Sequence, residues 1–254
     1  MSASNARVKQ LRRLSRRSER SERRLFLAEG RNAVEAALAA GVVEELLLQP
    51  DRAHLLPDVP DDVPTTLVDE RAMKALSDAV SPPGLLALCR FLDVPPAQAL
   101  SGGCVVICAQ VSEPGNAGTV IRTADAAGAG GVVLAGDSVD LYNPKTVRAS
   151  AGSVFHLPVA VGIGVEDAVA AARAAGYQVL ATEAAGDLDL FAADEVLARP
   201  TAWLLGNEAH GLDPAIAALA DHRVSIPIYG AAESLNLSTA AAVCLYATAR
   251  AQRG

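Results

Sequence analysis

From Cys104 onward, short apolar runs alternate with amphipathic segments, and this alternation constrains the fold more than any other feature of the chain. The apolar runs are CVVICAQV, GVVLAG, YQVLATEA, TAWLLGNE and HRVSIPI. Strands that are apolar along their whole length and separated by helices indicate a parallel sheet covered on both faces. We therefore predict an α/β domain over residues 104–254. Ligands of such sheets bind beyond the carboxyl ends of the strands, so functional residues are expected in the loops that follow the strands.

A second, smaller α/β unit is predicted in front of this domain, over residues 22–93. It contains a helix that ends near Gly41, a strand over 45–49, a further strand and helix in TTLVDERAMKALSD, and a strand in GLLALCRFL. Residues 94–103 have the proline, alanine, serine and glycine content of a linker. The predicted order is thus a small domain, a linker and a larger domain.

The N-terminal segment 1–21 is basic, whereas the rest of the chain is acidic. Nine of the 22 Lys and Arg residues lie before residue 25, against two Glu, although the whole chain has a net charge of −7. Blocks of like charge are often disordered and bind polyanions such as nucleic acid. We predict a flexible arm, for which two interpretations stay open: a contact with a polyanion, or a solubilising tail.

Several common classes of protein are disfavoured by what the sequence lacks. No apolar stretch approaches the ~20 residues that span a bilayer, and the polar N-terminus does not resemble a secretory signal, so we expect a cytoplasmic protein without membrane contact. The four cysteines form no CxxC pair, and Cys104 and Cys108 would lie roughly 13 Å apart on one strand, so no metal is expected. P-loop, HExxH and nucleophile-elbow motifs are absent, and GAGG at 128–131 follows a helix rather than a strand.

The first loop of interest leads into the segment EPGNAGTVIRTAD, residues 113–125. In a helix that starts at Ala117, Gly118 and Arg122 share one face, and Asn116 stands where an N-cap would. The free N–H groups of such a helix start suit an anion. A purely structural interpretation stays open, in which Asn116 only caps the helix and Arg122 only pairs with Asp125.

The second loop, LLGNEAHGLDPAI at 204–216, places a carboxylate between two glycines at the end of a strand. Gly206 and Gly211 bracket Glu208, and glycines at such a position let the backbone approach a ligand closely. Asp213 is interpreted as the N-cap of a short helix, and His210 is given no role.

The third loop, within SIPIYGAAESLNLSTAAAVCLY at 225–246, joins a strand to an alanine-rich helix. Either Ser234 or Asn236 is placed to cap that helix, which is also the structural interpretation of each. The triplet at 240–242 permits close backbone packing against the sheet or against a second subunit.

Taken together, the three loops resemble the signature of the SpoU (TrmH-like) family of RNA 2'-O-ribose methyltransferases, which belongs to the SPOUT superfamily. The matching pieces are EPGNAGTVIRTADAAG, LLGNEAHGL and IPIYGAAESLNLSTAAAV, in the family's order, together with VRASAGSVFHLPV. The likeness covers about residues 104–250. Residues 22–93, which include SPPGLLAL, resemble the ribosomal-protein-L30e-like substrate-binding domain of many members.

The resemblance implies a fold, a cofactor and a set of site residues. It implies an α/β trefoil-knot domain that works as a homodimer and uses S-adenosylmethionine. The polar active-site positions carried over from the family are Asn116, Arg122, Glu208, Ser234 and Asn236. The positions carried over for the cofactor pocket are Leu205, Gly206, Ile226, Pro227 and Leu235.

The implied reaction is methyl transfer from S-adenosylmethionine to a ribose 2'-hydroxyl of RNA, most simply of 23S ribosomal RNA. An arginine guanidinium stays protonated in proteins, so Arg122 is expected to position the hydroxyl and stabilise negative charge, and a role as base is left open. The alternatives are a tRNA methyltransferase, a non-catalytic RNA-binding member of the family, and an unrelated α/β enzyme with a solubilising tail.

Overall fold

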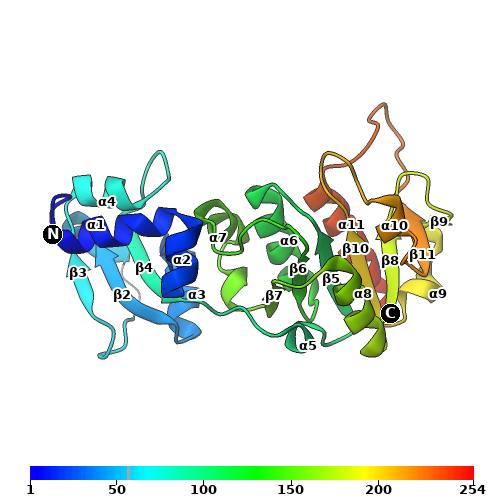
Figure 1. Cartoon of the computed structure of the whole chain (residues 1–254), viewed down its shortest axis with the longest axis horizontal. Coiled ribbons are helices and arrows are strands. Elements are labelled where there is room, and N and C mark those ends of the chain that lie inside the picture. Colours follow the sequence, from blue (N-terminus) through cyan, green and yellow to red (C-terminus); the bar gives the residue numbers. More distant parts are fainter. Residues whose placement is uncertain (56–57) are drawn as a thin grey trace. The chain divides into compact units, whose positions relative to one another are not determined.

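The computed structural model describes residues 1–55 and 58–254, and Figure 1 shows the course of the chain. The chain divides into two compact units. The first consists of Met1–Leu92 and Tyr142–His156, and the second of Asp93–Leu141 and Leu157–Gly254. The first unit is therefore discontinuous in sequence, because it takes in fifteen residues from within the predicted larger domain.

The first unit is built on a four-stranded sheet with the order β1-β4-β2-β3. Strands β1 and β2 pair with β4 antiparallel, whereas β3 pairs with β2 in parallel. Its strands are β1 (Leu25–Glu29), β2 (Val43–Leu48), β3 (Thr65–Leu67) and β4 (Leu85–Arg90). The helical elements that accompany them are α3 (Arg31–Ala39), η2 (Pro50–Leu55), α4 (Glu70–Leu76), α7 (Pro144–Ser150) and η3 (Ser153–Phe155).

The prediction of a flexible arm over residues 1–21 is wrong. This segment forms α1 (Ala6–Arg12), η1 (Arg13–Ser15) and the start of α2 (Arg17–Arg23). Its three apolar side chains are buried and join the core of the first unit. They are Val8, Leu11 and Leu14, whose three-residue spacing puts them on one face of a helix. Their burial outweighs the charge repulsion that the composition indicated.

An aromatic cluster holds residues 142–156 in the first unit. Tyr142 stacks on Phe91 with ring centroids 3.6 Å apart, and Phe155 stacks on Phe26 at 5.9 Å. Phe26 also lies 4.7 Å from Tyr142. The backbone N–H of Leu92 donates to the Tyr142 hydroxyl over 2.8 Å. The first unit is thus closed by side chains that come from two distant parts of the sequence.

The second unit contains a seven-stranded sheet with the order β7-β6-β5-β10-β8-β11-β9, in which every pair of neighbours among the described residues is parallel. The predicted α/β fold class is confirmed. The strands are β5 (Cys104–Ala109), β6 (Val132–Ala135), β7 (Val159–Val161), β8 (Gln178–Thr182), β9 (Leu188–Asp189), β10 (Thr201–Leu205) and β11 (His222–Ser225). The helical elements are α5 (Pro96–Ala99), α6 (Pro114–Ala127), α8 (Val165–Ala174), η4 (Leu190–Ala192), α9 (Asp194–Leu197), α10 (Pro214–Ala217) and α11 (Leu237–Arg253).

Both faces of this sheet are covered, as its apolar strands require. On one face, Ala202 and Leu204 of β10 join a core cluster with the apolar side chains of α8. On the other, Trp203 is fully buried and its indole N–H donates to Thr248 of α11 over 2.9 Å. Alternate residues of a strand point to opposite faces, so α8 and α11 lie on opposite sides of the sheet.

The segment 94–103, predicted as a linker, is part of the second unit. It contains the short helix α5, in which Ala99 is buried in the core cluster. A side chain at Gly131 would come 2.2 Å from the carbonyl oxygen of Ala99, so the contact requires a glycine. Proline is common at the first position of a helix and alanine favours helix formation, so this composition is compatible with a short packed helix as well as with a linker.

All four cysteines are buried and free, and burial raises the pKa of Cys104 and Cys108 to about 12. These thiols therefore act as small apolar core groups. Across residues 1–55 and 58–254, the structure contains no helix with the length and apolarity to cross a bilayer.

Candidate active site

The three loops singled out in the sequence meet through hydrogen bonds in the second unit. They follow the carboxyl ends of β5, β10 and β11, and the side chains that join them are Asn116, Glu208 and Asn236. The strands of a parallel sheet end at one edge, which is why residues so far apart in sequence come together.

Glu208 is the centre of this arrangement. Its Oε2 accepts from the backbone N–H and the hydroxyl of Ser112, at 3.1 and 3.0 Å. Its Oε1 accepts from the backbone N–H of Glu113 and from Asn116 Nδ2, each at 3.1 Å. Three donors from the loop after β5 and one from the first turn of α6 thus hold one carboxylate from the loop after β10. We call this set, Ser112, Glu113, Asn116 and Glu208, the carboxylate clasp.

Asn116 does not cap its helix. The helix α6 begins at Pro114, and the side chain of Glu113 is the N-cap, accepting from the backbone N–H of Gly115. Proline at the first helical position explains the earlier start. The amide of Asn116 is therefore free to donate to Glu208, and its Oδ1 accepts from Asn236 Nδ2 at 3.2 Å.

Asn236 has two roles at once. Its side-chain oxygen accepts from the backbone N–H of Ser238 at 2.9 Å and so caps α11, as one of the two open interpretations predicted. Its amide nitrogen reaches Asn116. The start of α11 is thereby tied to the carboxylate clasp. The other candidate cap, Ser234, is exposed and does not cap the helix.

A second set of contacts fixes the same two loops through their backbones. Asn207 Nδ2 donates to the carbonyl oxygen of Gln110 over 2.8 Å. Gln110 has a φ of 59°, a left-handed conformation that is uncommon for a residue with a side chain and typical of functional sites. The left-handed turn at Gln110 precedes the segment whose N–H groups face Glu208. Asn207 and Gly211 exchange both backbone hydrogen bonds at 2.8 Å, closing the loop after β10.

Gly206 is required by the geometry of this loop. A β-carbon at residue 206 would lie 2.4 Å from the carbonyl carbon of Gly211, which no side chain can tolerate. The backbone of the loop after β10 therefore folds tightly back on itself, next to the buried end of the strand at Leu205. Gly206 is thus fixed by this close approach, whereas Gly211 has open space around it and a φ of 69°, a left-handed conformation that favours glycine.

The carboxylate clasp keeps Glu208 ionised. Partial burial by itself raises the pKa of this carboxyl group, but the hydrogen bonds from its own backbone, Asn116, Ser112 and Glu113 outweigh that effect, and the pKa lies below its usual value. A carboxylate with a lowered pKa is a weak base. Glu208 is thus suited to hold its donors in place rather than to take up a proton.

The remaining predicted residues occupy the surroundings of this centre. Arg122 is exposed on α6 and, within the described part of the chain, has no hydrogen bond or ion pair, so the predicted pair with Asp125 is not formed. Of the residues assigned to a cofactor pocket, Leu205 is buried, whereas Ile226, Pro227 and Leu235 are half-buried. The hydrogen bonds bring together Asn116, Glu208 and Asn236, and they do not include Arg122 or Ser234.

Sequence reasoning missed Ser112, Gln110 and Asn207. Ser112 donates two of the four bonds to Glu208, yet it lies 96 residues away in the chain. A serine before Glu-Pro is unremarkable by type. Its position directly after an apolar strand, in the segment where ligands bind, is the one signal that points to it.

Two family descriptions match the chain. Residues 103–246 match the SpoU rRNA Methylase family, and residues 5–87 match the MRM3-like substrate binding domain. The chain is 34% identical over 246 residues to the 23S rRNA (guanosine(2553)-2'-O)-methyltransferase RlmP of Bacillus subtilis (strain 168), covering 96% of each protein.

Solved structures with similar folds carry related names. The SpoU methyltransferase AviRb from Streptomyces viridochromogenes, in complex with the cofactor AdoMet, is 34% identical, with a TM-score of 0.84 and coverage of 98% of both chains. An AdoMet-bound rRNA methyltransferase from Sinorhizobium meliloti is also 34% identical, with a TM-score of 0.84 over 97% of this chain and 95% of that one. The resemblance seen in the three loops is confirmed, and the chain belongs to the SpoU rRNA methylase family.

Proposed function

We propose that this protein transfers a methyl group from S-adenosylmethionine to a ribose 2'-hydroxyl of 23S ribosomal RNA. The observation that carries the proposal is the joining of Asn116, Glu208 and Asn236, one residue from each family motif, at the carboxyl edge of the parallel sheet. Full-length similarity to a protein named as a 23S rRNA 2'-O-methyltransferase supports the choice of RNA. A tRNA substrate is the second candidate, and nothing in the geometry of the site favours it.

The loops around this centre fit the cofactor. The loop after β10 folds tightly at Gly206, directly beyond the buried end of the strand, and the half-buried side chains of Ile226, Pro227 and Leu235 offer apolar surface for an adenine ring. We infer that Leu205, Gly206 and these three residues hold the cofactor. When bound, S-adenosylmethionine supplies a methyl group that is already electrophilic.

The chain's own residues then have to place the ribose hydroxyl and deal with its proton. Arg122 extends from α6 without a competing partner among the described residues. Its guanidinium donates to the ribose oxygen or the adjoining phosphate and stabilises the negative charge that develops as the O–H bond weakens. The clasp fixes the first turn of α6, and Arg122 projects from the same helix less than two turns further along. Because Glu208 is a weak base and Arg122 stays protonated, the proton passes to solvent or to a group of the RNA.

We infer a division of labour between the two halves of the chain. The first unit binds the RNA, in keeping with the match of residues 5–87 to a substrate-binding domain, and residues 104–254 carry out the transfer. We also infer that the active enzyme is a homodimer in the cytoplasm. Exposed aromatic side chains at Tyr229 and Tyr246, in the loop before α11 and on α11, supply apolar surface for such an interface.

The test is methyl transfer with tritiated S-adenosylmethionine and unmodified 23S rRNA or tRNA transcripts, with the label mapped by resistance of the adjacent bond to alkali. We expect label at a ribose of 23S rRNA. We expect Arg122→Ala to lose most of this activity while it still binds cofactor and RNA, and the exposed Arg199→Ala on the same unit to behave as wild type. A methyl-transfer rate of Arg122→Ala equal to that of the wild-type protein would show that Arg122 has no part in the mechanism. If the tRNA transcripts are labelled and the 23S rRNA is not, the protein is a tRNA methyltransferase.

A further inference from the structure

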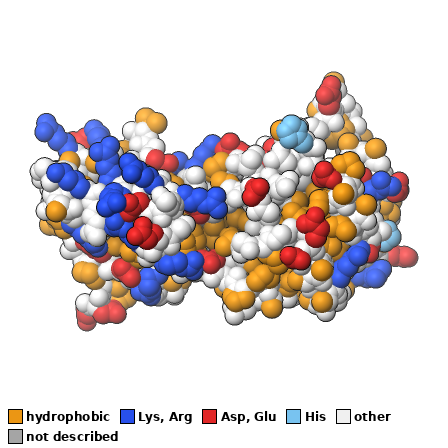
Figure 2. Space-filling view, in the orientation of Figure 1, with side chains coloured by type: hydrophobic (Ala, Val, Ile, Leu, Met, Phe, Trp, Pro, Cys, Tyr) orange, Lys and Arg blue, Asp and Glu red, His pale blue; other side chains and the backbone are white. Residues whose placement is uncertain are grey.

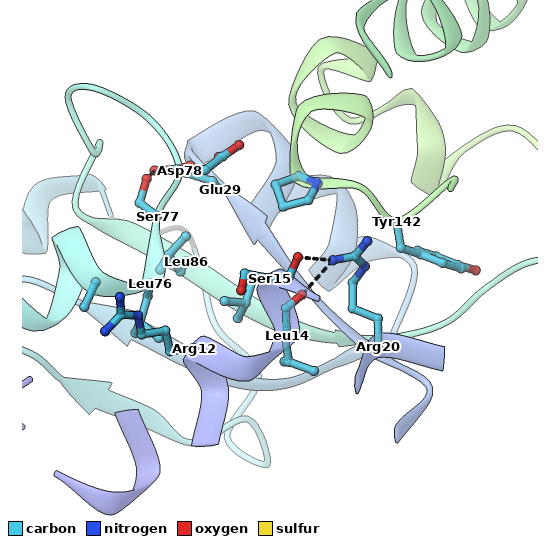
Figure 3. A pocket seen from close by; sticks show the side chains of 13 residues that line it. Arg12, Leu14, Ser15, Arg20, Glu29, Leu76, Ser77, Asp78, Leu86 and Tyr142 are labelled. Atoms are coloured by element: carbon cyan, nitrogen blue, oxygen red, sulfur yellow. Dashed lines mark hydrogen bonds between the residues drawn. The ribbon is translucent and has the colours of Figure 1, made fainter. Parts of the chain in front are cut away.

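A cavity of about 230 Å³ lies in the first unit, and none of its lining residues belongs to the three loops of the candidate site (Figure 3). It is enclosed by the N-terminal helical segment, the sheet, the end of α4 and the start of α7. The cavity is smaller than the roughly 300–1,000 Å³ of sites for drug-sized ligands, so its size suits one small ring rather than a whole nucleotide. Nothing in the proposed chemistry uses it.

The floor of the cavity is apolar. Leu14 and Leu86 are buried, and Leu27 and Leu76 beside them are half-buried. Such a surface accepts the flat face of an aromatic ring. Unstacked bases of single-stranded RNA are bound in this way, with a face on an apolar or aromatic surface and an edge on polar groups.

One wall of the cavity presents carboxylates. Glu29, Ser77 and Asp78 lie together on one side, opposite Arg12 in the view of Figure 3. The Ser77 hydroxyl donates to Glu29. The Arg148 guanidinium donates to both carboxylate oxygens of Asp78 and also forms an ion pair with Glu29, whose Oε2 lies 3.8 Å from Nη1. Burial raises the pKa of Glu29, and the Ser77 hydrogen bond and the charge of Arg148 offset this only in part. Acceptor capacity remains for an N–H group that enters the cavity.

The N-terminal segment carries positive charge that the fold does not use, and one of these cations, Arg12, lines the cavity. Five of the nine basic residues of the N-terminal segment have partners within the first unit. Arg7 pairs with Glu45, Arg13 and Arg23 pair with Glu19, Arg20 donates to the carbonyls of Leu14 and Ser15, and Arg24 lies over the ring of Phe91.

The other four, Lys9, Arg12, Arg16 and Arg17, are exposed and have no partner within residues 1–55 and 58–254. Figure 2 shows Lys and Arg side chains gathered over the N-terminal unit. Arg12 lines the cavity itself. Exposed, uncompensated cations of this kind bind phosphates of a nucleic acid backbone.

We propose that this cavity takes one unstacked, amino-bearing pyrimidine of the RNA, a cytosine, with its amino group on the Glu29 and Asp78 wall and a flanking phosphate on Arg12. The proposal rests on the proposed function only in taking RNA as the partner. Cytosine and uracil have the same size, but cytosine offers an amino donor where uracil offers an oxygen. A carboxylate wall therefore selects cytosine.

The test compares two labelled single-stranded oligonucleotides, oligo(C) and oligo(U) of equal length, by fluorescence anisotropy at low salt with the full chain. We expect oligo(C) to bind about tenfold more tightly, the lower end of what one correct base contact gives. Ala75 lines the cavity, and Ala75→Phe should abolish this preference while phosphate-driven binding remains. The control Ala39→Phe, at an exposed position of α3, should keep it.

Charge is tested in the same assay. Arg12→Gln should weaken both oligonucleotides and reduce the slope of log K against log salt by about 0.7, the value for one phosphate contact in a single strand. The control Arg31→Gln, on α3 outside the cavity, should change neither. In wild-type protein, methyl resonances of the cavity leucines should shift when oligo(C) is added, which keeps the proposal testable even if Ala75→Phe does not fold.

Equal affinity for the two oligonucleotides, unshifted leucine methyls, or an unchanged preference in folded Ala75→Phe would each overturn the proposal. The proposed function fails differently. If the wild-type protein labels no RNA yet prefers oligo(C), the cavity stands and the methyltransferase assignment falls. If it labels 23S rRNA without any such preference, the assignment stands and the cavity proposal falls.

Discussion

Replacing Glu208 by glutamine should slow methyl transfer by about 30-fold with little loss of stability. In the wild-type protein each carboxylate oxygen of Glu208 accepts two hydrogen bonds. Glutamine keeps one of these oxygens, but its amide nitrogen is a donor and would face the other two donors without accepting from them. Two hydrogen bonds are lost, each worth about 1 kcal/mol net at this partly exposed position. If the clasp orients α6 for the reaction, the loss raises the activation free energy by roughly 2 kcal/mol, which corresponds to about a 30-fold fall in kcat/KM.

The assay is initial-rate methyl transfer to the RNA that the wild-type protein labels, with cofactor binding and thermal unfolding measured in parallel. The control is Glu195→Gln, which removes the same charge from an exposed position of α9 and should change kcat/KM by no more than about twofold. A rate for Glu208→Gln within the range of that control would refute the role given to the clasp. A fall beyond about a thousandfold would instead assign the carboxylate a direct part in the reaction.

Three further predictions follow from the second unit. Gly206→Ala should abolish cofactor binding, measured by calorimetry, because its β-carbon has no room, whereas Gly230→Ala, with open space around it, should bind normally. Thr248→Val should lower the free energy of unfolding by about 1–3 kcal/mol in a denaturant titration, because it leaves the buried Trp203 indole N–H without an acceptor. The lowered pKa of Glu208 makes its stabilising contribution complete above pH 4.5 and lost as the pH falls through the lowered value, so no step from this group should appear in the rate profile between about pH 5 and 9.

The sheet of the second unit was predictable because its strands leave few alternatives. The strands β5 and β10 are buried at every position, and apart from Thr201 they are apolar, so they fit only between two covering layers. The start of α6 was harder. Asn116 is a residue type that often caps helices. However, Glu113 caps α6 and Pro114 is its first residue, so the helix starts three residues earlier than predicted. This shift places Asn116 inside the first turn, where its side chain faces Glu208 instead of capping the helix.

Two shortcomings of the sequence analysis, at the N-terminal segment and at Ser112, have a common cause, which is that the partners lie far away in the chain. In the N-terminal segment, Val8, Leu11 and Leu14 pack into the core of the first unit and Arg7 pairs with Glu45, so the charged block is folded. At the active site, Ser112 becomes important through a residue in another loop. Local composition registers the charge and the serine, but it does not register the partner. Composition therefore predicted a flexible arm where the chain is folded, and it gave no reason to select Ser112 as a site residue.

The discontinuity of the first unit sets an order of events during synthesis. When the ribosome has made residues 1–92, the rings of Phe26 and Phe91 still lack Tyr142 and Phe155, which lie well over forty residues further along the chain. The nascent N-terminal half thus waits, with part of its core open to solvent, until the polypeptide through His156 has left the exit tunnel. Domains usually mature one after another from the N-terminus, but here completion of the first depends on translation well into the second. A gene fragment cut at the apparent domain boundary would encode a half without its closing side chains.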